Sequence, residues 1–103
     1  MKNEISEIDG HRIETVTQEF NSANVLRMRV GTDCPRGGDA GHGGRTVIIL
    51  DSANGSTEMH CTQRHGKIEL VFRGDTECET LIDALAFASE TLRKMHADNQ
   101  RGV

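Results

Sequence analysis

Large aromatic side chains are scarce in this sequence: among 103 residues there is no tryptophan, no tyrosine and only three phenylalanines. A hydrophobic core must therefore be built mainly from Ile, Leu, Val and Met, and hydrophobic residues make up only 35% of the chain. A chain of this length forms one domain, and a core this modest gives a stability of about 5 kcal/mol, near the lower end for native domains. We therefore expect a homo-oligomer, because association would bury additional apolar surface.

Clusters of basic residues are also missing. The 12 Lys and Arg residues are scattered among 16 Asp and Glu residues, and the formal net charge is −4. Duplex nucleic acid is bound through a basic face that displaces counterions from the phosphates. We therefore expect no duplex-binding role, whereas individual arginines remain available to hold a small anion.

Long apolar segments are absent as well. Residues 1–9 are polar and acidic, without the apolar stretch of a signal peptide, and nothing approaches the length of about 20 apolar residues that spans a bilayer. The three cysteines are odd in number and widely spaced. Free thiols in a reducing cytoplasm, with no membrane association, are the expectation.

Alternation of apolar and polar residues predicts β-strands over much of the chain. In the segment 25–30 the apolar side chains fall on one face, and the other face carries Arg27 and Arg29. The segment 46–50 is β-branched and apolar, which is typical of a more central strand. Further strands are expected over residues 12–20, 57–62 and 67–73.

The C-terminal part of the chain predicts a helix. Thr76 and Glu79 have the spacing of a capping box, and apolar residues then recur at steps of three and four, at Leu81, Leu85, Ala88, Leu92 and Met95. The expected fold class is α+β, an antiparallel β-meander of about five strands with one C-terminal helix packed on one face. We expect a flexible lead-in over residues 1–10, a single domain over 11–98 and a tail over 99–103.

A glycine-rich segment, residues 31–45, separates two of the predicted strands. It holds six of the eleven glycines and the only proline, Pro35. A plain connection between strands takes about two to five residues, and each glycine costs roughly 0.5–1 kcal/mol of backbone entropy relative to alanine. A chain with a small core is expected to retain such a loop for a function.

The composition of this loop favours the binding of an anion. Successive glycines can turn their N–H groups into one concavity that holds phosphate oxygens, and three basic side chains add charge-assisted donors. Asp33 and Asp39 can orient those side chains or accept hydrogen bonds from a ribose. The predicted ligand-binding residues are Arg36, Gly37, Gly38, Asp39, Gly41, His42, Gly43, Gly44, Arg45 and Thr46.

Several established site patterns do not fit the loop. It has neither the Gly-x-Gly-x-x-Gly spacing nor the Gly-Lys-Ser/Thr ending of nucleotide-binding loops, and it precedes a strand. Ala40 stands where the serine-protease Gly-Asp-Ser-Gly signature needs a serine. We therefore expect no catalytic residue of that kind and no cofactor.

Metal binding is an alternative interpretation of the same region. The candidate ligands are Cys34, Asp39 and His42 in the loop and His60, Cys61 and His65 further along the chain. Their spacings match no standard zinc pattern, so we expect no metal. A nucleophilic set of Cys34, Asp39 and His42 lacks the rigid positioning that such catalysis needs.

Two segments carry a resemblance to a known family. The strings Gly37–Thr46 and Arg73–Glu77, the latter followed by the apolar helix segment Leu81–Ala88, resemble short bacterial and phage proteins. These proteins share a Gly-Gly-Asp-x-Gly-His-Gly-Gly-Arg-Thr loop and a Gly-Asp-Thr-Glu helix start, and the resemblance spans residues 24–92. It implies a phage or prophage setting, in which a small protein sequesters host nucleotide signals, but no established activity.

The leading hypothesis is a small cytoplasmic binding protein, acting in the host cell if phage-encoded, that holds a nucleotide or cyclic nucleotide at the glycine-rich loop. One alternative is a protein-interaction module, such as a phage inhibitor that docks on a host protein through the loop or an exposed strand face. A small metal-dependent enzyme is the third hypothesis, and overall we favour a protein that is not an enzyme.

Overall fold

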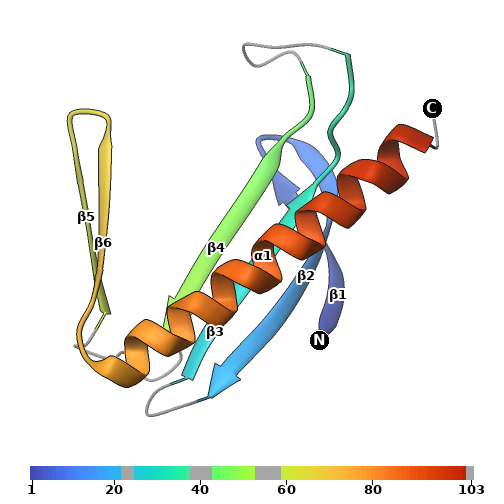
Figure 1. The fold of residues 1–103 in the computed structure, drawn as a ribbon. Coiled ribbons are helices and arrows are strands. Elements are labelled where there is room, and N and C mark those ends of the chain that lie inside the picture. Colours follow the sequence, from blue (N-terminus) through green and yellow to red (C-terminus); the bar gives the residue numbers. More distant parts are fainter. Residues whose placement is uncertain (22–24, 38–42, 53–58, 102–103) are drawn as a thin grey trace.

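The structure, a computed structural model, describes residues 1–21, 25–37, 43–52 and 59–101. Within these ranges the chain forms six strands and one long helix (Figure 1). The elements are β1 (Lys2–Ile8), β2 (His11–Asn21), β3 (Val25–Thr32), β4 (Thr46–Ser52), β5 (Met59–Arg64), β6 (Lys67–Phe72) and α1 (Asp75–Arg101).

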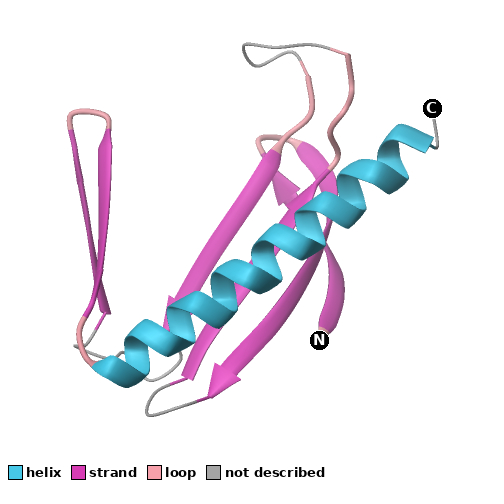
Figure 2. Cartoon of the chain, viewed as in Figure 1, coloured by secondary structure: helices cyan, strands magenta, loops and turns pink. Residues whose placement is uncertain are grey.

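The strands form two antiparallel sheets. Strands β1 to β4 lie side by side in sequence order, and β5 pairs with β6 as a separate hairpin. Helix α1 lies across one face of the four-stranded sheet (Figure 2). The predicted α+β fold with a C-terminal helix on an antiparallel sheet is confirmed. The strands do not form one continuous meander but a four-stranded sheet and a separate two-stranded hairpin.

Residues 1–10 differ from the expected flexible lead-in. Lys2–Ile8 form strand β1, which pairs with β2 along its whole length, from Lys2 opposite Thr17 to Ile8 opposite His11. The segment is polar because an edge strand keeps much of its surface in water, so its sequence carries no strong apolar alternation. At the other end, α1 continues to Arg101 and includes much of the expected tail.

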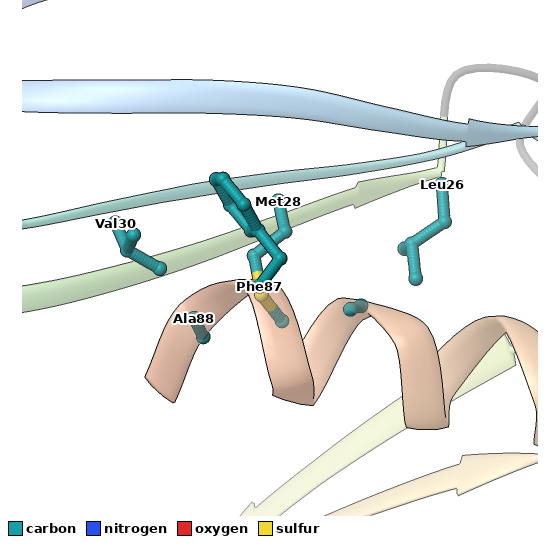
Figure 3. Close-up of a cluster of buried hydrophobic side chains, with 6 residues drawn as sticks. Leu26, Met28, Val30, Phe87 and Ala88 are labelled. Carbon is teal, nitrogen blue, oxygen red and sulfur yellow. The ribbon is translucent and has the colours of Figure 1, made fainter. Parts of the chain in front are cut away.

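The core lies between β3 and α1. Leu26, Met28 and Val30 project from β3 and are buried against Ala84, Phe87 and Ala88 of the helix (Figure 3). The Phe20 and Phe87 rings meet edge to face with their centroids 5.8 Å apart. The small alanines let the helix approach the sheet closely, so a chain with few aromatic residues still closes this core.

The buried face of α1 is rotated relative to the predicted stripe. The structure buries Thr80, Ala84, Phe87 and Ala88, whereas Leu85, which we expected in the core, is 54% exposed and Ile82 is 60% exposed. The helix has more apolar residues around its circumference than one four-stranded sheet covers. Packing against β3 therefore selects one part of a broad apolar surface and leaves another part uncovered.

Truncation of Met28 tests this core. Met28→Ala is expected to lower the free energy of unfolding by about 2–5 kcal/mol, because it removes a side chain that is only 1% exposed and leaves a cavity. Urea unfolding at a fixed protein concentration measures the change. Ile5→Ala, at a position 51% exposed, is the control and should cost less than about 1 kcal/mol; equal losses would contradict the assignment of the core.

Candidate functional site

The glycine-rich loop leaves β3 after Thr32 and returns to the sheet at Thr46, at the end where α1 also terminates (Figure 1). The structure describes its two arms, residues 33–37 and 43–45. The Asp33 amide donates to the Arg45 carbonyl at 3.2 Å, so the arms extend the β3–β4 pairing one step beyond the strands. The predicted site residues Gly38, Asp39, Gly41 and His42 lie outside the described residues.

One carboxylate connects the two arms. Asp33 Oδ1 accepts a hydrogen bond from the backbone amide of Arg45 at 2.7 Å, and Asp33 Oδ2 accepts one from Arg36 Nη1 at 2.9 Å. The Asp33 side chain is only 18% exposed. The contact with Arg36 agrees with the expectation that an aspartate of the loop orients a basic side chain.

The surroundings of Asp33 favour its charged form. Burial acts to raise the pKa of this carboxyl, but the hydrogen bonds from the Arg45 amide and the Arg36 guanidinium outweigh burial. The charges of Arg36 and His11 act in the same direction, and the pKa lies below its ordinary value. A partly buried carboxylate is destabilising without such partners. The hydrogen bonds at the base of the loop therefore stabilise the charged form of Asp33, and the charged carboxylate in turn holds the two arms together.

The two arginines of the arms occupy different environments. Arg45 turns back toward the β1–β2 turn, with Nε 3.2 Å from Asp9 Oδ2 and Nη1 2.8 Å from the Gly43 carbonyl oxygen. Its side chain is 21% exposed, whereas that of Arg36 is 55% exposed. Arg45 therefore connects the loop to the neighbouring hairpin, and Arg36 presents its guanidinium to solvent.

A second group of hydrogen bonds fixes the first arm to the rest of the fold. Thr32 Oγ1 lies 2.9 Å from Thr46 Oγ1 and accepts from the Cys34 amide at 3.1 Å. Asn99, near the end of α1, donates from Nδ2 to the carbonyl oxygens of Thr32 and Cys34, both at 3.0 Å. Sheet and helix thus hold the loop from two sides, and the predicted hydroxyl of Thr46 belongs to this group.

Two glycines of the arms have identifiable local requirements. A Cβ atom on Gly44 would lie 2.7 Å from Asp33 Oδ1 and 2.8 Å from Cys34 Sγ, so only glycine lets the arms approach this closely. Gly37 has a φ of +68°, in the left-handed region where glycine carries no steric cost. The arms therefore use glycine for a close approach at one point and for a turn at another.

Asp9 and Asn99 belong to this arrangement but were not among the predicted site residues. Asp9 fell in the expected lead-in and Asn99 in the expected tail, yet both contact the loop arms. The contacts exist because the β1–β2 turn and the end of α1 meet at the same end of the sheet. The Asp9–Gly10 pair indicates a turn in the sequence, but no local pattern indicates what that turn contacts.

The candidate metal ligands are not brought together in the part of the chain that the structure describes. Cys34 lies at the loop, whereas His60, Cys61 and His65 lie on the β5–β6 hairpin, which stands apart from the loop in Figure 1. Among the described ranges, no three His, Cys, Asp or Glu side chains form a group that could hold a metal ion. Asp39 and His42 lie outside those ranges.

The sheet face opposite α1 offers a second polar surface. Arg27 and Arg29 project there, as their alternation predicts, beside a groove of about 470 Å³ lined by residues of β1, β2 and β3. Arg27 lies 2.8 Å from Glu19 and 3.2 Å from Asp51. The hydrogen bond and charge of Glu19, with those of Asp51, keep the pKa of Arg27 above its ordinary value.

Arg29 on this face is likewise paired, with Nη2 2.7 Å from Glu4 Oε1. Each of the two outer-face arginines therefore has a carboxylate partner on a neighbouring strand. Arg36 also has a carboxylate partner, Asp33, but its side chain is 55% exposed, against 43% for Arg27 and 34% for Arg29. The outer face therefore offers an anion less accessible guanidinium groups than Arg36 does.

Comparison of the chain with protein-family models, with curated proteins and with solved structures finds no match. Within the described ranges, no helix combines the length and the apolar character that crossing a membrane requires.

The charge of Asp33 predicts a pH dependence of stability. A pKa lowered in the folded state contributes stability that is present above the unfolded pKa of about 3.9 and is lost as the pH falls through the folded value. Asp33→Asn is therefore expected to be less stable than the wild type at pH 7, and the difference should shrink below about pH 4. Urea unfolding from pH 7 to pH 2 measures it.

Asp83→Asn, on the exposed surface of α1, is the control and should leave stability nearly unchanged at pH 7. A difference between Asp33→Asn and the wild type that is constant over the whole pH range would contradict a structural role for the carboxylate charge.

Asn99 gives a second test of the loop arms. Asn99→Ala removes two hydrogen bonds to the first arm, so the bond after Arg36 should become several-fold more susceptible to trypsin, because protease cleavage requires local opening. Limited proteolysis followed by mass spectrometry locates and times the cut. Gln100→Ala, an exposed neighbour, should cleave at the wild-type rate; equal rates in both variants would show that Asn99 does not hold the arm.

Proposed function

We propose that this protein binds a phosphate-bearing small molecule, a nucleotide or cyclic nucleotide, at the glycine-rich loop and sequesters it. The observation that carries the proposal is the fixed base of the loop, where Asp33 joins the two arms and Asn99 holds the first arm to α1. A plain connection between strands requires no such set of side-chain contacts. Fixed arms reduce the conformational entropy that a ligand must overcome when it binds.

Arg36 is the principal contact that we propose for the phosphate. A guanidinium carries five N–H donors in a planar fork, and Asp33 accepts a hydrogen bond from Nη1. The remaining donors can meet phosphate oxygens while the ion pair with Asp33 is kept. Asp33 then acts as a positioning residue that directs the planar group, an arrangement suited to bidentate phosphate recognition.

The charge balance of the site suggests how such a ligand is recognised. Arg36 and Arg45 are accompanied by Asp33 and Asp9, so the base of the loop is close to neutral overall. Affinity would therefore come from directed hydrogen bonds more than from net positive charge. Salt should weaken this binding far less than it weakens the binding of a polyanion by a basic surface.

Sequestration without conversion is the role we favour. The resemblance to short bacterial and phage proteins supports a setting in which a small, homo-oligomeric cytoplasmic protein removes nucleotide signals by binding them in stoichiometric amounts. A binder of this kind needs a held ligand and no catalytic group, in keeping with the loop composition.

A thermal-shift screen of nucleoside mono-, di- and triphosphates and cyclic nucleotides tests the proposal. A ligand at 100 times its Kd adds about 2.7 kcal/mol of stability, which raises Tm by roughly 10 °C in a domain of this size. Arg36→Ala should weaken binding by roughly 10- to 100-fold, because it removes charge-assisted hydrogen bonds. Arg64→Ala, an exposed arginine of the β5–β6 hairpin, should bind as the wild type does.

Other outcomes of the same screen would favour the other hypotheses. If no nucleotide raises Tm, or if Arg36→Ala and Arg64→Ala bind equally well, the loop is not the site that we propose. Recovery of a chemically altered nucleotide would support an enzyme, and stabilisation by a divalent metal alone would support a metal site.

A further inference from the structure

Large aliphatic side chains remain exposed on β4 and α1. Ile48 of β4 is 53% exposed, and Ile82 and Leu85 of α1 are 60% and 54% exposed; these three residues are called the β4–α1 set. Ile48 is paired with the buried Val30 in the β3–β4 register, so it lies on the face of the sheet that carries the helix. Within the described residues, the side chains of the β4–α1 set are therefore left about half exposed or more.

The β5–β6 hairpin carries a second uncovered apolar surface. The register places Cys61 opposite Leu70 and Gln63 opposite Ile68, so Cys61, Leu70 and Ile68 share one face, called the hairpin face. Phe72 lies on the same face and packs against the core. Leu70 and Ile68 lie nearer the hairpin turn than Phe72 does, and their exposed fractions are 46% and 66%.

The exposed edge of β4 points to the same side of the molecule. Among the residues that the structure describes, β4 pairs with β3 alone, so its other edge has no partner strand there. Natural edge strands are commonly protected by lysine, proline or a bulge. The sequence of β4, Thr-Val-Ile-Ile-Leu-Asp-Ser, contains no lysine or proline.

The total surface is larger than a compact monomer of this size exposes. The structure has 7126 Å² of accessible surface, whereas a folded monomer of 11.3 kDa exposes about 5,700 Å². The excess of about 1,400 Å² exceeds the roughly 800 Å² per partner that a stable interface buries. The radius of gyration, 14.9 Å, likewise exceeds the value of about 12.8 Å for a compact chain of this length.

We propose that a second copy of this chain covers these surfaces in a two-fold symmetric dimer, with the hairpin face of each copy packed on the β4–α1 set of the other. Each copy then supplies both halves of a self-complementary contact, as an isologous interface requires. The two surfaces do not cover one another within one chain, since all five of their large aliphatic residues are about half exposed or more.

The hairpin face carries no charged residue of its own, which favours its burial against apolar side chains. The basic residues near the hairpin tip, Arg64 and Lys67, are paired with each other in the register and lie on the opposite face, where Lys67 is 3.5 Å from Glu69. The residues of the β4–α1 set and of the hairpin face lie outside the arms of the glycine-rich loop, so substitutions there test the dimer without altering the proposed ligand contacts.

The mass of the protein in solution tests the dimer. Light scattering coupled to size exclusion should give about twice the chain mass of 11.3 kDa for the wild type at micromolar concentration. Ile48→Lys and Ile68→Glu should each raise the Kd of the dimer at least tenfold, because each buries a charge against apolar residues. Ile5→Lys is the matched control, since Ile5 is 51% exposed but lies on β1 at the opposite edge of the sheet, and it should remain dimeric.

Mixing the two disruptive variants tests the reciprocal arrangement. A mixed dimer of Ile48→Lys with Ile68→Glu has one unaltered contact and one contact that pairs the new lysine with the new glutamate, so the mixture should recover the dimer mass. Circular dichroism confirms that each variant is folded. A monomeric wild type, a mixture that remains monomeric, or an Ile5→Lys variant as disruptive as Ile48→Lys would overturn the proposal.

Discussion

The candidate site depends on the position of one charged carboxylate. Asp33 follows β3 directly, and its side chain accepts hydrogen bonds from the amide of Arg45 in one arm of the glycine-rich loop and from the guanidinium of Arg36 in the other. Because glycines contribute no side chains of their own, something else must determine where the arms run. Asp33 does so together with Asn99 of α1, which ties the loop to the same helix that closes the core.

A small core also shapes the molecule away from the site. The helix is buried through alanines and Phe87, and its larger apolar residues Ile82 and Leu85 remain outside. A four-stranded sheet is too narrow to cover a helix with apolar residues on more than one side. The exposed apolar surface on α1, β4 and the hairpin therefore has the same cause as the low expected stability of the single chain: the core that one chain can bury is small.

The elements predictable from the sequence are those with strong local patterns. Alternation around Leu26 and Met28 gave β3 and its two faces, and the capping box with its apolar repeat gave α1. Strand β1 was not predictable, because its pairing with β2 determines it and its side chains are mostly polar. The rotation of α1 and the contacts of Asp9 and Asn99 depend on how distant segments meet, and local patterns do not carry that information. The choice of loop as the ligand site stays a prediction.

We propose that the ligand binds between the fixed arms of the loop and not on the outer face of the sheet. Amide hydrogen exchange, with and without the nucleotide that gives the largest thermal shift, tests this directly. We expect slower exchange over residues 33–37 and 43–46 in the presence of ligand, with no change around Arg27 and Arg29. Slower exchange on the outer sheet face, with the arms unaffected, would contradict it.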